Sequence, residues 1–180
     1  MNHPGLSTVR YFPLILLLCW VPHHASGQTT IDKLDPHEYF DFWVGSWDLT
    51  WEAPDGTIEH GTNRIEKILD GNVILENFRT ESGRFEGYEG KSFSVYQKTT
   101  GKWRQTWVDD SSEYFDLTGK IEGNKRIFIT EVPGPNGSTV LKRMVFYDIT
   151  DDSFTWDWQS SSDGGETWKL LWRIHYERKE

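Results

Sequence analysis

Cysteine is almost absent from this chain of 180 residues, which contains only Cys19. This residue lies near the N-terminus, in a segment that we expect to be removed from the mature protein. The remaining chain would then have no disulfide, no thiol nucleophile and no thiolate metal ligand. Its stability must come from a packed core rather than from covalent cross-links.

Clustered positive charge is also missing. The chain contains 19 Lys and Arg residues against 28 Asp and Glu residues, for a formal net charge of −9, and no run of Lys or Arg exceeds two residues. Binding to phosphate groups requires clustered cations that displace counterions. Nucleic acid and anionic membrane surfaces are therefore poor partners, and the acidic balance serves solubility.

No apolar run is long enough to cross a membrane, which takes ~20 residues. The run at residues 11–21 has eleven residues, follows Arg10, and precedes the small residues Ala25-Ser26-Gly27. This pattern is typical of a secretory signal peptide. We expect a signal peptide over residues 1–27, a short tether over 28–34 and a single domain over 35–180. The mature protein would be periplasmic or secreted, without a membrane span.

Helical patterns are scarce, and one short segment predicts a helix. Asp35-Pro36-His37-Glu38 supplies an N-cap residue, a proline at the first helical position and a glutamate three residues after the cap. Gly45 is expected to end this helix after two or three turns.

Beyond Gly45, apolar residues recur at every second position, and turn residues such as Asp70-Gly71 and Pro133–Gly137 separate the alternating segments. We expect strands over residues 46–52, 57–69, 72–81, 85–97, from 103 onward, 113–121, 126–132, 139–148, 153–159 and 167–178. About ten short strands at regular spacing predict an all-β fold.

Short hairpin turns connect nearly all of these segments, which describes an antiparallel up-and-down meander. An immunoglobulin-type sandwich would instead need long crossing connections and usually an inter-sheet disulfide. A meander of ten strands avoids exposed sheet edges most simply by closing on itself. The sequence therefore predicts a β-barrel of about ten strands, with the short N-terminal helix covering one end.

Tryptophan is abundant, with ten residues in the chain. Large rings of this kind can fill a core or line a cavity, and both are compatible with the pattern. For a ligand-binding barrel, the alternation assigns the walls to Trp47, Trp51, Trp103, Trp107, Trp156, Trp158 and Trp172.

Three polar residues share the phase of these apolar positions, namely Asn63, Glu76 and Gln105. We therefore expect them to point inward as well. A buried amide or carboxylate must find a hydrogen-bond partner. These groups would either bond to one another across the barrel or fix the orientation of a ligand.

Several blocks of the sequence are similar to known proteins. The segment Phe42-Trp43-Val44-Gly45-Ser46-Trp47 resembles the signature at the head of lipocalins and other calycins. The blocks at 41–48 (DFWVGSWD), 61–66, 69–71, 100–109 (TGKWRQTWVD) and 162–168 resemble an uncharacterised family of bacterial exported calycin-like domains. The resemblance implies a lipocalin-like barrel, export, and a place for Trp47 at the closed end. The chain lacks the usual lipocalin disulfides, and a family of unknown function implies no catalytic residue.

The function expected from these features is binding of a small, largely apolar ligand inside an exported barrel, with no catalytic residue, cofactor or metal assigned. Three alternatives stay open. Some calycin-like barrels, the nitrobindins, hold haem through a histidine on a late strand, and His175 lies on the last strand, although alternation aims it at solvent. An enzyme could pair Glu76 with His60, which shares phase with Ile58. A structural or protein-interaction module would have a filled core.

Overall fold

The computed structural model describes residues 31–179 of the chain. The predicted signal peptide, residues 1–27, and the first part of the predicted tether, residues 28–30, lie outside the described residues. Across the described part, none of the helices has the length and apolar character needed to cross a membrane.

Ten strands follow three short N-terminal helical turns. The elements are η1 (Ile31–Lys33), η2 (Pro36–Glu38), η3 (Asp41–Trp43), β1 (Gly45–Glu52), β2 (Ile58–Ile68), β3 (Val73–Thr80), β4 (Glu89–Gln97), β5 (Lys102–Asp109), β6 (Tyr114–Glu122), β7 (Lys125–Pro133), η4 (Pro135–Gly137), β8 (Thr139–Tyr147), β9 (Ser153–Ser161) and β10 (Lys169–Arg178). Every predicted strand is present. The start of β4 differs most from its prediction, because residues 85–88 fold into the loop that precedes this strand.

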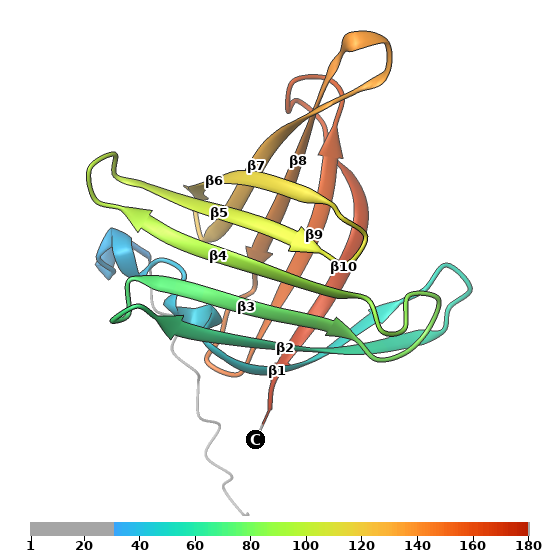
Figure 1. Cartoon of the computed structure of the whole chain (residues 1–180), viewed down its shortest axis with the longest axis horizontal. Coiled ribbons are helices and arrows are strands. Elements are labelled where there is room, and N and C mark those ends of the chain that lie inside the picture. Colours follow the sequence, from blue (N-terminus) through green and yellow to red (C-terminus); the bar gives the residue numbers. More distant parts are fainter. Residues whose placement is uncertain (1–30, 180) are drawn as a thin grey trace, which may run out of the picture.

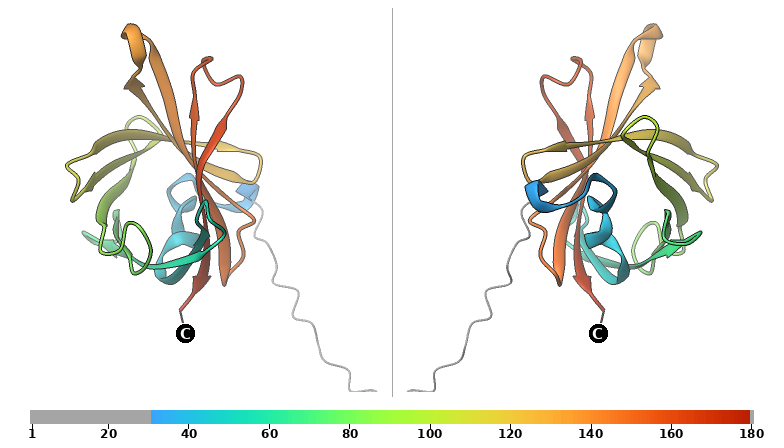
Figure 2. Two further views of the ribbon diagram at one scale, coloured as in Figure 1. Left: turned by 90° about the vertical axis from the view of Figure 1, so that its right-hand side faces the viewer. Right: turned by 90° about the vertical axis from the view of Figure 1, so that its left-hand side faces the viewer.

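The strands form one closed antiparallel barrel in the order β1-β10-β9-β8-β7-β6-β5-β4-β3-β2 (Figures 1 and 2). Each strand pairs with its neighbours in sequence, and β1 pairs with β10 to close the ring. The predicted up-and-down barrel is thus confirmed. Closure removes the exposed edges that an open sheet of this size would present.

The N-terminal segment differs from the prediction, because it forms 3₁₀ turns rather than one helix of two or three turns. The expected capping box at Asp35 is present. Phe40 then leaves helical geometry, with φ −112° and ψ 11°. Its buried ring stacks on Phe128 at 4.4 Å between centroids and meets Trp103 edge-on at 5.0 Å. Burial of this ring against the barrel end decides the path of the chain.

Polar contacts fasten the turns to this closed end. The indole Nε1 of Trp47 donates to the carbonyl of Trp43 at 2.8 Å, and the indole Nε1 of Trp103 donates to the carbonyl of Pro36 at 2.8 Å. Arg178 lies over the Trp47 ring at 4.2 Å. Trp47 therefore packs at the closed end, as the family resemblance implied.

Alternation places side chains on the inner and outer faces of the wall. Asn63, Glu76 and Gln105 are all buried, as their phase predicted. His60 and Ile58 are both exposed and lie on the outer face. The inward orientation of His60, which the enzyme alternative required, is therefore wrong. The inward positions on this part of β2 are Glu59, Gly61 and Asn63, which are all buried. Gly61 has no side chain, so the Trp51 ring packs close to its backbone.

We expect Phe40→Ala to lower the free energy of unfolding by about 3–5 kcal/mol, because it removes a fully buried ring and leaves a cavity under the barrel. Phe85→Ala is the matched control. It removes the same atoms from a ring that is 59% exposed, and should change stability by less than about 1 kcal/mol. Chemical denaturation of both variants measures the difference, and equal losses would contradict the assigned role of Phe40.

Candidate ligand cavity

A cavity of about 260 Å³ lies in the half of the barrel that the N-terminal turns do not fill. Its lining comes from strands β3, β5, β6, β8, β9 and β10 and from the loops between β3 and β4 and between β5 and β6. The residues are Glu76, Phe78, Tyr88, Trp107, Asp109, Glu113, Phe115, Lys142, Met144, Trp156, Trp158, Trp172, Ile174 and Tyr176. We call the deep end at Glu76 and Tyr176 the floor, and the end at Tyr88, Asp109 and Lys142 the mouth.

Indole rings form much of the wall. Trp156 and Trp158 are nearly parallel, with centroids 6.4 Å apart and an interplanar angle of 6°. Trp172 meets Trp156 edge-on at 6.1 Å, and Phe115 packs on Trp158 at 5.5 Å. These contacts hold the rings in fixed orientations, so the cavity has a preformed apolar surface.

The floor is polar and internally hydrogen-bonded. Asn63 Nδ2 donates to Glu76 Oε1 at 2.7 Å and to the Tyr176 hydroxyl at 3.3 Å. Ser92 Oγ donates to Glu76 Oε2 at 2.6 Å. Asn63 and Ser92 lie on β2 and β4, so the Glu76 carboxyl group on β3 connects three strands beneath the cavity, and Asn63 extends the network to Tyr176 on β10.

Glu76 has no cationic partner among these contacts, so nothing compensates the negative charge of its ionised form. Burial raises the pKa of Glu76 from 4.5 to about 7, although hydrogen bonds from Ser92 and Asn63 oppose the shift. Burial, together with the nearby Glu76 carboxylate, also raises the pKa of Tyr176 above its usual range. Below neutral pH the floor is therefore uncharged, with a carboxyl proton and a phenol proton available.

Gln105 lies beside this network rather than on the cavity surface. Its Nε2 donates to Ser92 Oγ at 3.2 Å and to Ser94 Oγ at 3.0 Å. Within residues 31–179, the buried Oδ1 of Asn63 and Oε1 of Gln105 have no hydrogen-bond donor. The polar layer is thus only partly satisfied by the protein, which is unusual for buried amides.

Asp109 organises one side of the mouth. Its Oδ2 accepts hydrogen bonds from the Tyr88 hydroxyl at 2.6 Å and from Trp107 Nε1 at 3.1 Å. Its Oδ1 accepts from the backbone N–H groups of Ser111 and Glu113. Burial alone would raise the pKa of Asp109, but these four donors hold it below its usual value. Trp107 is therefore locked in place by a charged group.

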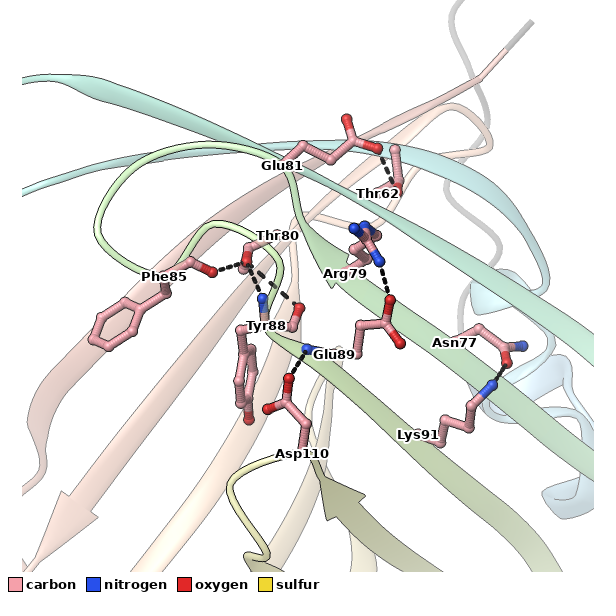
Figure 3. A network of polar contacts seen from close by, with 10 residues as sticks. All are labelled: Thr62, Asn77, Arg79, Thr80, Glu81, Phe85, Tyr88, Glu89, Lys91 and Asp110. Carbon is pink, nitrogen blue, oxygen red and sulfur yellow. Dashed lines mark hydrogen bonds and ion pairs between the residues drawn. The ribbon is translucent and has the colours of Figure 1, made fainter.

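The loop between β3 and β4 is fastened to the strands that flank it (Figure 3). Thr80 Oγ1 bonds to the carbonyl of Phe85 and accepts from the backbone N–H of Tyr88 at 3.1 Å. The backbone N–H of Glu89 donates to Asp110 at 3.1 Å, and an ion pair joins Glu89 to Arg79. Tyr88 and Phe85 are thereby held in position at the rim.

Lys142 is the cation at the mouth. Its Nζ lies 5.4 Å from the Phe115 ring centroid and 5.7 Å from that of Trp158. Over the part of the chain that the structure describes, it makes no ion pair. Aromatic faces and solvent therefore stabilise its charge, because the side chain is half-buried.

The ten predicted site residues divide into four groups. Trp107, Trp156, Trp158 and Trp172 line the cavity together with Glu76. Trp47 and Trp103 pack at the closed end, and Asn63 and Gln105 support the floor from beside it. Trp51 lies at the rim, where its Nε1 donates to Glu59 at 2.7 Å.

Sequence reasoning did not single out several lining residues. Phe115, Lys142 and Met144 follow the alternation of their strands, so the inward phase could have identified them. Tyr88 lies in a loop, where no periodicity marks a residue as inward. Its position depends on contacts with Thr80 and Asp109 that the sequence does not reveal.

The histidine alternatives are not supported. His175 is exposed on the outer face and contacts Thr155, so it cannot ligate a haem inside the barrel. His60 lies outside while Glu76 lies inside, so the wall separates the proposed acid–base pair. Among residues 31–179, no three His, Cys, Asp or Glu side chains come together as metal ligands would.

The raised pKa of Glu76 predicts a pH-dependent difference between the wild type and Glu76→Gln. A group whose pKa rises from 4.5 to about 7 on folding stabilises the native state below pH 4.5, and that contribution is lost as pH rises through 7. Raising the pH from 5 to 8 should therefore shift stability toward the variant by on the order of 2–3 kcal/mol. Urea denaturation at both pH values measures this shift, and a difference independent of pH would contradict the assigned burial of charge.

Comparisons with known proteins identify a family and leave the function open. One solved structure similar to this chain is a redesigned β-barrel, with 14% sequence identity and a TM-score of 0.41, covering 79% of this chain and 96% of that chain. No curated protein sequence matches the chain at a significant level. A family model described as a protein of unknown function, DUF1579, matches residues 32–178. The chain therefore belongs to the DUF1579 family.

Proposed function

We propose that this protein is an exported, calycin-like binding protein that holds a small, largely apolar molecule in its barrel cavity. The observation that supports this best is the cavity itself, because a ring of fixed aromatic side chains surrounds a floor with a few convergent polar groups. Small-molecule sites commonly combine an apolar lining with a few placed polar groups. Export rests on the signal-like segment at residues 11–27.

The cavity volume bounds the ligand. An apolar protein cavity of ~150 Å³ holds a benzene molecule. Scaling from that case, the volume of about 260 Å³ corresponds to a molecule with about ten carbon atoms. A bicyclic aromatic compound or a medium-length alkyl chain meets this limit.

The floor adds a preference for one type of polar group. Among the contacts of the described residues, the Tyr176 hydroxyl accepts from Asn63 and donates to no protein acceptor. The neutral Glu76 carboxyl also holds a proton below pH 7. Both groups favour a ligand that presents a hydroxyl or carbonyl oxygen, whereas a carboxylate at this depth would meet no cation and would be poorly solvated.

Removing the Tyr176 hydroxyl should weaken binding of an oxygen-bearing ligand selectively. Tyr176→Phe keeps the ring, which stacks on Phe154 at 4.2 Å. We expect this variant to bind 1-naphthol about fivefold more weakly than the wild type, and naphthalene equally well, since one neutral hydrogen bond contributes about 1 kcal/mol. Isothermal titration calorimetry and tryptophan fluorescence measure both affinities.

Filling the cavity provides the second test. Ile174→Trp replaces an aliphatic side chain with an indole ring at a lining position and should abolish binding of both naphthalene probes. Retained thermal unfolding would show that the variant is folded. If the wild type gives no heat and no change of tryptophan fluorescence with any apolar probe, the proposed function is wrong.

A further inference from the structure

The barrel is closed along only part of the seam between its first and last strands. Among the described residues, the ladder pairs Trp47–Thr50 of β1 with His175–Arg178 of β10. From Lys169 to Ile174, β10 pairs with β9 alone. Figure 1 shows the two strands diverging from their paired segment toward the open end. A gap in the wall therefore begins above the Thr50–His175 pair.

A bulge shapes the β10 side of this gap. The register between β10 and β9 shifts between Leu170 and Trp172. Because an extra residue changes the phase of a strand, Trp172 faces the cavity while Leu170 and Leu171 are both partly exposed, at 43% and 45%. Two adjacent exposed leucines thus border the seam.

A groove of about 1000 Å³ occupies the gap, and we call it the seam groove. Its apolar lining includes Leu170 and Leu171 on β10, Ile58 on β2 and Phe85 in the loop between β3 and β4. Ile58 is 52% exposed. Phe85 is held at the rim by the bond between its carbonyl and Thr80 (Figure 3).

Four Glu and Arg side chains line the seam groove, and two of them, Glu59 and Arg173, are engaged within the protein. Glu59 accepts hydrogen bonds from Trp51 Nε1 at 2.7 Å and from the backbone N–H of Arg84 at 3.2 Å. Arg173 forms a bidentate pair with Asp157, at 2.7 and 2.9 Å. Glu52 and Arg84 also line the groove, and the Arg84 guanidinium lies 5.4 Å from the Phe85 ring centroid, beside the apolar side chains that a ligand could cover.

The seam groove and the cavity share two lining residues, Trp158 and Trp172. Trp172 also meets Trp51 edge-on, with centroids 5.2 Å apart and an interplanar angle of 89°. One indole ring therefore has the interior chamber on one side and the external groove on the other. The two spaces are neighbouring parts of one apolar surface.

We propose that the seam groove is the second half of the ligand site and that the ligand is an elongated alkyl or acyl chain. One end of the chain occupies the cavity, and the remainder passes Trp172 and lies along Leu170, Leu171 and Phe85. This inference rests on the proposed function. It follows from the two lining residues that the adjoining spaces share and from the cavity volume, which limits the enclosed part to about ten carbon atoms.

A chain-length series tests the proposal on the full-length protein. Titration with n-alkanols of six to fourteen carbons, followed by tryptophan fluorescence, should show affinity rising about fourfold per methylene through the whole series. Affinity that stops rising near ten carbons would overturn the proposal while leaving the cavity site intact. Absence of binding by every alkanol would instead refute the proposed function itself.

A surface variant separates the groove from the cavity. Leu171→Asp should weaken tetradecanol binding at least tenfold and leave hexanol binding unchanged. Leu69→Asp is the matched control, because Leu69 is 71% exposed and lies in the turn between β2 and β3 at the other end of the barrel, and it should change neither affinity. Unchanged tetradecanol binding by Leu171→Asp would overturn the proposal. A second outcome would also overturn it: the wild type is a dimer, and Leu171→Asp dissociates the dimer without changing alkanol binding. The groove would then be an interface between two copies of the chain.

Discussion

The packing of Phe40 and Trp43 into one end of the barrel determines how the rest of the interior is used. These rings, together with Trp47 and Trp103, fill the closed end, and the indole N–H groups of Trp47 and Trp103 are satisfied by backbone carbonyls of the same N-terminal segment. The opposite half has no such segment, so its rings face a space rather than one another. The barrel therefore has a densely packed core at its closed end and a hollow chamber in the opposite half.

The sequence predicted the fold well, because alternation and turn residues report directly on strands and their connections. It also predicted that Asn63, Glu76 and Gln105 face inward. It failed for His60 because Ile58 suggested the wrong phase, and the small inward residue Gly61 gives no hydrophobic signal. Alternation gives the face of a residue but not its depth, so it could not separate Trp103, at the closed end, from Trp107, at the cavity.

The floor of the chamber buries the Glu76 carboxyl group among aromatic rings and also holds it in a fixed orientation by hydrogen bonds. An ionised carboxylate is costly in an aromatic interior. Among the described residues no cation neutralises Glu76, and burial raises its pKa. Asn63 and Ser92 donate hydrogen bonds that keep the carboxyl group oriented, and Asn63 also donates to the Tyr176 hydroxyl. Burying a carboxyl group has a desolvation cost that an entirely apolar layer would not have, and such departures from local stability rules concentrate at functional sites.

The closing contacts also have a consequence for folding order. Arg178 donates to the carbonyl of Val44, and Trp47 faces Arg178 across the β1–β10 ladder, so the seam joins residues more than 130 positions apart in the chain. Contacts of such long sequence separation carry a large loop-closure entropy and slow folding. One edge of strand β1 must therefore stay unpaired until β10 has been synthesised, and the ring can close only then.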